Sequence, residues 1–116
     1  MVDTSSDGPA VSRQRPTLLY TDLVGSTALG AAMEPEDYRA LLQALRAIWH
    51  AVAQALQARV VLTQGDGALI AFGIPLAGEQ DGRHAVDAAL RVHAQVGALQ
   101  PAGVPAACLP LRMHSA

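Results

Sequence analysis

One stretch near the N-terminus constrains the fold more than any other part of the chain. The run Thr17-Leu-Leu-Tyr-Thr leads to Asp22 and breaks soon afterwards into Gly25-Ser26-Thr27. A short apolar run bounded by turn formers is typical of a buried β-strand, and Pro16 before it favours extended backbone. Glycine and hydroxyl residues at the start of a helix offer free backbone N–H groups. We therefore expect a strand that carries Asp22 to its end, beside a turn able to hold an anion.

The spacing of apolar residues predicts helices in two later regions. After a short helical piece at residues 28–32, Pro35 suits the first turn of a helix whose apolar side chains recur every three or four residues as far as Leu56. Tyr38 and Trp49 fit this stripe. The same spacing predicts another helix over roughly residues 80–98. Each of the two long helices has one apolar face, so we expect both to cover a sheet.

Three further segments have the composition of strands. Residues 60–63 and 68–72 flank Gln64-Gly65-Asp66-Gly67, which predicts a β-hairpin with Asp-Gly at its tip. The last segment, residues 108–114, contains Pro110, which favours an edge strand because proline has no N–H to donate. The order strand, helix, hairpin, helix, strand predicts an α+β, ferredoxin-like β-α-β-β-α-β fold. In that fold an antiparallel sheet has both helices on one face.

Length and charge exclude several classes of protein. The 116 residues suffice for one domain, which we assign to residues 17–116, and residues 1–16 have the polar composition of a disordered tail. A net charge of −2 argues against a nucleic-acid partner. The chain has no apolar run of the ~18 residues that a membrane span needs, and no signal peptide, so we expect a cytoplasmic protein.

The residue types limit the possible chemistry. All eight basic residues are arginine, which removes lysine chemistry from consideration. The single cysteine, Cys108, excludes an internal disulfide and a zinc cage, and its apolar context predicts a buried thiol. His50, His84 and His93 lie in predicted helices without a shared ligand spacing, and we expect them at the surface or at an interface. His114 lies near the C-terminal end.

The predicted topology places two carboxylates at one edge of the sheet. Asp22 ends the first strand and Asp66 lies in the hairpin turn, and in the usual strand order the first and third strands are neighbours, ~4.8 Å apart. Two carboxylates at such a spacing repel each other until they share a proton or bind divalent cations. Oxygen ligands suit Mg²⁺ or Mn²⁺, and two such ions are a common arrangement for phosphoryl-group displacement. Taken singly, Asp22 could be only a cap and Asp66 only a turn residue.

Two motifs together resemble a known family. Tyr20-Thr-Asp-Leu-Val-Gly-Ser-Thr27, followed about forty residues later by Gln64-Gly-Asp-Gly-Ala-Leu-Ile-Ala-Phe-Gly73, resembles the class III adenylate/guanylate cyclase catalytic domain. The resemblance covers residues 17–114 and implies an incomplete nucleotide cyclase fold. Active members of the family are dimers whose sites lie between subunits.

The resemblance also implies roles for individual residues. Asp22, Asp66 and the backbone carbonyl of Leu23 would hold two ions, Mg²⁺ or Mn²⁺, on a nucleoside triphosphate. The phosphates would contact Gly25, Ser26 and Thr27. The implied reaction is attack of the ribose 3′-hydroxyl on the α-phosphorus, which gives a 3′,5′-cyclic nucleotide and pyrophosphate.

The chain departs from the family pattern in two places. Leu62 stands where adenine-selecting members have a lysine, three residues before Gly65-Asp66, so the choice between ATP and GTP stays open. Residues 109–116 resemble the strand and turn that open the second half of the domain, and the sequence does not include the family's transition-state Asn and Arg. The resemblance therefore covers the N-terminal, metal-binding half.

Three functional hypotheses follow. The first is a nucleotide cyclase domain for intracellular signalling, acting as a homodimer or paired with a complete cyclase-like chain. The second is a catalytically inactive cyclase-like module for regulation or dimerisation. A palm-type nucleotidyl transferase is disfavoured, because it expects a pair of acids in the hairpin, where this chain has only Asp66.

Overall fold

The computed structural model describes residues 15–74 and 77–116. The elements, in chain order, are β1 (Thr17–Leu23), α2 (Ser26–Ala32), α3 (Pro35–Ala55), β2 (Arg59–Gln64), β3 (Gly67–Phe72), α4 (Asp81–Ala98), the 3₁₀ turn η1 (Ala106–Cys108) and β4 (Met113–Ser115). The predicted tail, residues 1–16, lies outside the described residues except for Arg15 and Pro16. Pro75, in the loop after β3, also lies outside them. None of the described helices is long and apolar enough to cross a membrane.

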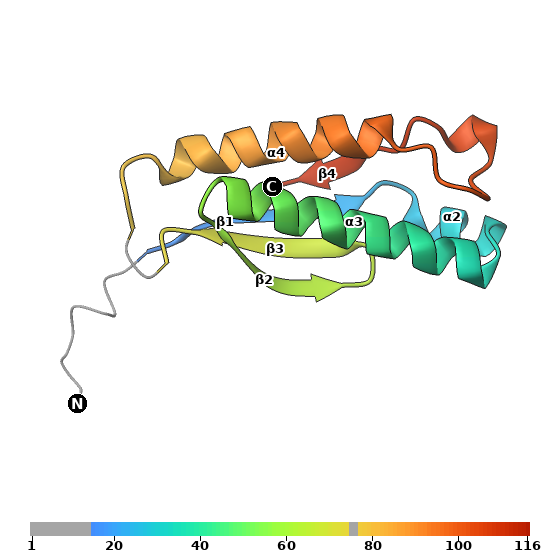
Figure 1. Ribbon diagram of the computed structural model, residues 1–116, viewed down its shortest axis with the longest axis horizontal. Coiled ribbons are helices and arrows are strands. Elements are labelled where there is room, and N and C mark those ends of the chain that lie inside the picture. Colours follow the sequence, from blue (N-terminus) through green and yellow to red (C-terminus); the bar gives the residue numbers. More distant parts are fainter. Residues whose placement is uncertain (1–14, 75–76) are drawn as a thin grey trace, which may run out of the picture.

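The four strands form one antiparallel sheet in the order β2-β3-β1-β4. Figure 1 shows α3 and α4 on the same side of this sheet. The predicted α+β fold, the pairing of the first strand with the third and the edge position of the last strand are therefore confirmed.

The long helix α3 forms where the sequence places its start signals. Glu34 is extended, Pro35 occupies the first turn, and Glu36 and Asp37 lie near the positive end of the helix dipole. The apolar stripe then faces the sheet, and the buried residues of this helix are Leu41, Leu45, Ile48, Trp49, Val52 and Ala53. Helix α4 contributes smaller side chains, namely Ala85, Ala88, Val92 and Val96. These side chains pack with Leu19, Ile70 and Phe72 of the sheet in one hydrophobic core.

The hairpin turn is shifted by one residue from the prediction. Its two central residues are Gly65 and Asp66, while Gly67 already begins β3. Gly65 has φ +57°, a left-handed conformation that glycine adopts without steric cost. A β-bulge between Val60 and Leu62 adds one residue to β2.

The C-terminal segment differs most from the expectation. A strand over residues 108–114 was predicted, but only Met113–Ser115 pairs with β1. The residues before it form a 3₁₀ turn that ends at Cys108, followed by Pro110, which cannot donate to a ladder. Cys108 is exposed, so the prediction of a buried thiol is wrong: the turn holds the cysteine at the surface, outside the alternation of a strand.

The sheet face opposite the helices has no covering element among the described residues. Leu18, Tyr20 and Leu62 are each about half exposed on the strands, at 53%, 48% and 55% of their surface. Their neighbours in sequence, such as Leu19 and Thr21, point to the helix side and are buried.

Candidate functional site

Asp22 lies within β1, which continues to Leu23 and so extends past the predicted end of the strand. The alternation of the strand buries Thr21 and Leu23 beneath the helices and turns Asp22 to the open face, where it is half-buried. Leu23 pairs with Met113 of β4 and ends the strand.

The register of β1 and β3 brings Asp22 next to the hairpin turn. Asp22 lies directly opposite Gly67, and Asp66 is the preceding residue of the turn. A Cβ atom at Gly67 would lie 3.4 Å from Asp22 Cβ and 3.0 Å from the Tyr20 hydroxyl oxygen. A side chain at Gly67 would therefore press on the Tyr20 hydroxyl and contact Asp22.

Neither aspartate is engaged by the protein in the part of the chain that the structure describes. The carboxylates of Asp22 and Asp66 make no hydrogen bond or ion pair with residues 15–74 or 77–116. No group of three or more His, Cys, Asp or Glu side chains gathers there as a metal cage either. The site thus offers two carboxylates with free oxygens, and any further ligands have to come from backbone, solvent or substrate.

The phenol of Tyr38 is affected by the negative charge of Asp66 in the hairpin turn. Burial raises the pKa of its phenol, and the nearby Asp66 carboxylate raises that pKa further. The ring lies over Gly30 of α2, where a Cβ atom would come within 3.4 Å of it. Tyr38 thus links α2, the first turn of α3 and the surroundings of Asp66.

The Gly25-Ser26-Thr27 segment forms the junction of β1 and α2. Gly25 has φ +69°, and a Cβ atom there would meet no atom within 4 Å, so the loop is open on this side. The Gly25 carbonyl accepts a hydrogen bond from the Leu29 N–H at 3.0 Å. Gly25 provides no side-chain cap, and Ser26 and Thr27 form the first turn of the helix.

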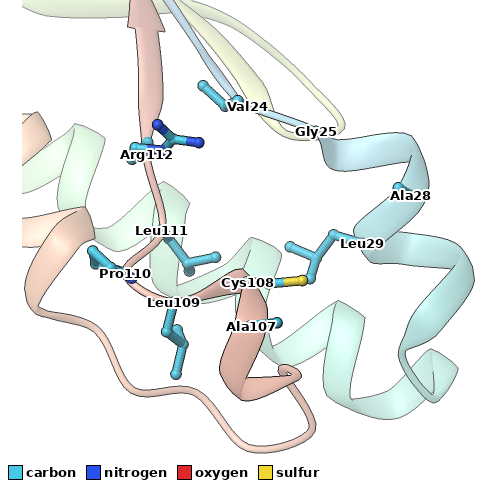
Figure 2. Close-up of a pocket in the computed structure, with 10 residues that line it drawn as sticks. All are labelled: Val24, Gly25, Ala28, Leu29, Ala107, Cys108, Leu109, Pro110, Leu111 and Arg112. Carbon is cyan, nitrogen blue, oxygen red and sulfur yellow. The ribbon is translucent and has the colours of Figure 1, made fainter.

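A cavity of about 550 Å³ opens between this junction and the segment before β4. Figure 2 shows the ten residues that line it: Val24, Gly25, Ala28, Leu29, Ala107, Cys108, Leu109, Pro110, Leu111 and Arg112. Gly25 is thus part of the lining, whereas Ser26 and Thr27 are not.

Arg112 is a residue of this region that the sequence did not identify. It is the charged member of the lining, and Figure 2 shows its guanidinium extending toward the Val24 side of the cavity. The Val24 N–H donates to the Arg112 carbonyl oxygen at 2.8 Å, which fixes the segment beside the end of β1. The sequence signal for this residue was a single arginine within an apolar segment. The position of Arg112 opposite Val24 depends on the register of β4, which the sequence does not give.

Comparison with known proteins assigns the chain to the family that its two motifs resemble. A family model described as the adenylate and guanylate cyclase catalytic domain matches residues 9–107. No curated protein matches the chain in sequence.

Solved cyclase domains share the fold. The guanylate cyclase domain of RhGC from Catenaria anguillulae, solved in complex with GTP, superposes with a TM-score of 0.75 at 21% identity, over 86% of this chain and 53% of its own. The guanylyl cyclase Cya2 gives a TM-score of 0.67 at 28% identity, over 87% and 52%. The adenylyl cyclase CyaB from P. aeruginosa gives 0.69 at 18%, over 86% and 53%. The chain spans about half the length of these structures.

Proposed function

Because the chain belongs to the family of adenylate and guanylate cyclase catalytic domains, we propose that it binds a metal–nucleoside triphosphate at the sheet edge that carries Asp22 and Asp66. The observation that carries the proposal is the pairing of Asp22 with Gly67, because Asp66 is the residue directly before Gly67 in the chain. In a complete site the reaction is conversion of ATP or GTP to the 3′,5′-cyclic nucleotide and pyrophosphate.

The donor set fits Mg²⁺ or Mn²⁺. Asp22 and Asp66 supply hard carboxylate oxygens with no partner among the described residues, and the Leu23 carbonyl is the proposed third protein ligand. Two such ions, when bound, neutralise the carboxylates and withdraw charge from the phosphates. Such ions usually keep several ligand positions for water and for substrate phosphates, which suits a site with only two acidic side chains.

We propose that the phosphates bind at the junction of β1 and α2, at the side of the cavity that Gly25 and Arg112 line. The open backbone at Gly25 allows close approach of an anion, and we propose the N–H groups of Gly25, Ser26 and Thr27 as donors to it. We add Arg112 to this set, because a guanidinium recognises phosphate oxygens with two parallel hydrogen bonds.

In the proposed reaction the 3′-hydroxyl oxygen forms a bond to the α-phosphorus while the bond from that phosphorus to the bridging oxygen of pyrophosphate breaks. The hydroxyl proton leaves to solvent, and pyrophosphate takes the electron pair. Arg112 and the Gly25–Thr27 backbone hold the β- and γ-phosphates, so they stabilise the charge that develops on the leaving group.

A partner is part of the proposal. The chain spans about half the length of the solved cyclase domains that it resembles. We propose that it acts as a homodimer or paired with a complete cyclase-like chain. The exposed apolar side chains Leu18, Tyr20 and Leu62 on the open sheet face favour a second function, a catalytically inactive module that regulates or dimerises such a chain.

Calorimetric titration with an Mn²⁺–nucleotide analogue tests binding. We expect Asp66→Asn and Asp22→Asn each to weaken binding about tenfold or more, equivalent to ~1.4 kcal/mol. The matched control is Asp87→Asn on α4, whose carboxylate is instead paired with Arg91 at 2.9 Å. Equal binding by Asp66→Asn and the parent chain would refute the proposed site. Cyclic-nucleotide formation with an added complete cyclase-like chain separates the catalytic function from the regulatory one.

A further inference from the structure

Three polar side chains form a hydrogen-bonded chain on the helix-covered face, directly behind the candidate site. His93 Nε2 of α4 lies 2.8 Å from Ser115 Oγ of β4, and Ser115 Oγ donates to Thr21 Oγ1 of β1 at 3.4 Å. Thr21 is fully buried, and within the described residues it is the only buried one of polar or charged type. One helix and two strands are thus joined through side chains.

The groups in this chain of bonds can each donate or accept. The Ser115 hydroxyl has one proton and can also accept, so it can bond both the His93 ring nitrogen and the Thr21 hydroxyl. Which of His93 and Ser115 donates depends on the tautomer of the ring. An apolar side chain at position 93 would leave the chain of bonds open at the helix.

Of the two strands joined in this way, β4 is the one that pairs with β1 at Asp22. Strand β4 has three residues and pairs with β1 in the register Thr21↔Ser115 and Asp22↔His114. Its inner face is held by Met113 in the core and by Ser115 through His93. Figure 1 shows α4 running along this edge of the sheet.

We propose that His93 is a positioning residue for the nucleotide site. By holding Ser115 it keeps β4 in register, and the register sets where Arg112 and His114 stand beside Val24 and Asp22. This inference rests on the proposed function, because it concerns the same metal–nucleotide site.

Two measurements test it on the full chain. The first is hydrogen exchange of the Val24 amide, which donates to the Arg112 carbonyl at 2.8 Å and so reports on β4 without any ligand. The second is the affinity for the Mn²⁺–nucleotide analogue. In His93→Leu we expect exchange at Val24 to accelerate and affinity to fall, each by about three- to tenfold, the factor that corresponds to one lost hydrogen bond.

Matched variants separate positioning from general stability. His93→Gln retains a side-chain amide, which can donate or accept a hydrogen bond at similar reach, and should restore both values. Arg91→Leu makes the same kind of change two residues away on α4, where only the exposed pair with Asp87 is lost, and should alter neither. Ser115→Ala removes the middle of the chain of bonds and should change exchange and affinity as much as His93→Leu does. The double variant, His93→Leu with Ser115→Ala, should change them no more than either single variant.

The outcomes are distinguishable. If exchange accelerates in His93→Leu while affinity stays unchanged, His93 has a structural role only and the positioning proposal is wrong. Unchanged exchange and affinity also overturn it. If the parent chain does not bind the Mn²⁺–nucleotide, the proposed function fails and the positioning role falls with it, whereas the exchange data still report whether His93 holds β4. If His93→Leu does not fold, Ser115→Ala decides the matter.

Discussion

Gly67 lies directly opposite Asp22 across the pair of β1 and β3, and a Cβ atom at Gly67 would contact Asp22 Cβ at 3.4 Å. This relationship sets the position of Asp22 relative to the hairpin turn. It also puts an aspartate near the end of one strand beside the turn that contains the other aspartate.

Removing one carboxylate should stabilise the metal-free chain. In Asp66→Asn we expect the free energy of unfolding to rise by about 0.5 kcal/mol, because the negative charge in the hairpin turn repels that of Asp22 on the neighbouring strand. Urea denaturation in the presence of a chelator measures this change. With Mn²⁺ added, the parent chain should become more stable than Asp66→Asn, since only the parent chain keeps both proposed carboxylate ligands.

The control for this experiment is again Asp87→Asn. Its carboxylate is paired with Arg91 on the surface of α4, so the same substitution should lower stability by ~0.3–0.5 kcal/mol and respond little to Mn²⁺. A loss of stability in metal-free Asp66→Asn would contradict the proposed repulsion.

Two glycines with open surroundings should respond to alanine in opposite directions. A Cβ atom would meet nothing within 4 Å at either Gly25 or Gly82, but only Gly25 has a left-handed backbone, with φ +69°. Gly25→Ala should therefore destabilise the chain by ~1 kcal/mol. Gly82→Ala, in the first turn of α4, should stabilise it by about 0.5 kcal/mol or less. Chemical denaturation of both variants checks the signs.

Bound nucleotide should protect Cys108 from modification. The thiol is exposed and lines the cavity that also contains Gly25 and Arg112. We expect a thiol reagent to react with one cysteine in the folded chain, and to react more slowly once the Mn²⁺–nucleotide analogue is present. The protection should be lost in Asp66→Asn. Equal rates with and without nucleotide would place the ligand outside this cavity.

The uncovered sheet face should promote self-association. Leu62 is 55% exposed on that face, and Val86 of α4 is 62% exposed on the helix side of the molecule. If the sheet face pairs two copies, Leu62→Gln should weaken the dimer by at least about tenfold, because burying a leucine is worth ~1.5–3 kcal/mol. Val86→Gln should leave it unchanged. Sedimentation at several concentrations measures both, and a monomer at every concentration of the parent chain would contradict the expectation.

Local patterns were sufficient for the elements that have strong signals. The stripe from Leu41 to Val52 specifies α3, and the hairpin follows from glycine and aspartate between two apolar runs. The segment that contains Cys108 and Pro110 was harder, because a short apolar run is compatible both with a strand and with a helical segment such as the 3₁₀ turn found there. There the tertiary contacts decided the outcome.

The sequence by itself determined the α+β order of elements, the family and the two aspartates that define the candidate site. These features depend on residues close together in the chain or on motifs with a fixed spacing. The tertiary structure alone decided that Gly67 stands opposite Asp22, that Arg112 borders the cavity and that His93 reaches Ser115. Those relationships join segments distant in sequence, and their geometry follows from strand register and helix packing, which no local pattern specifies.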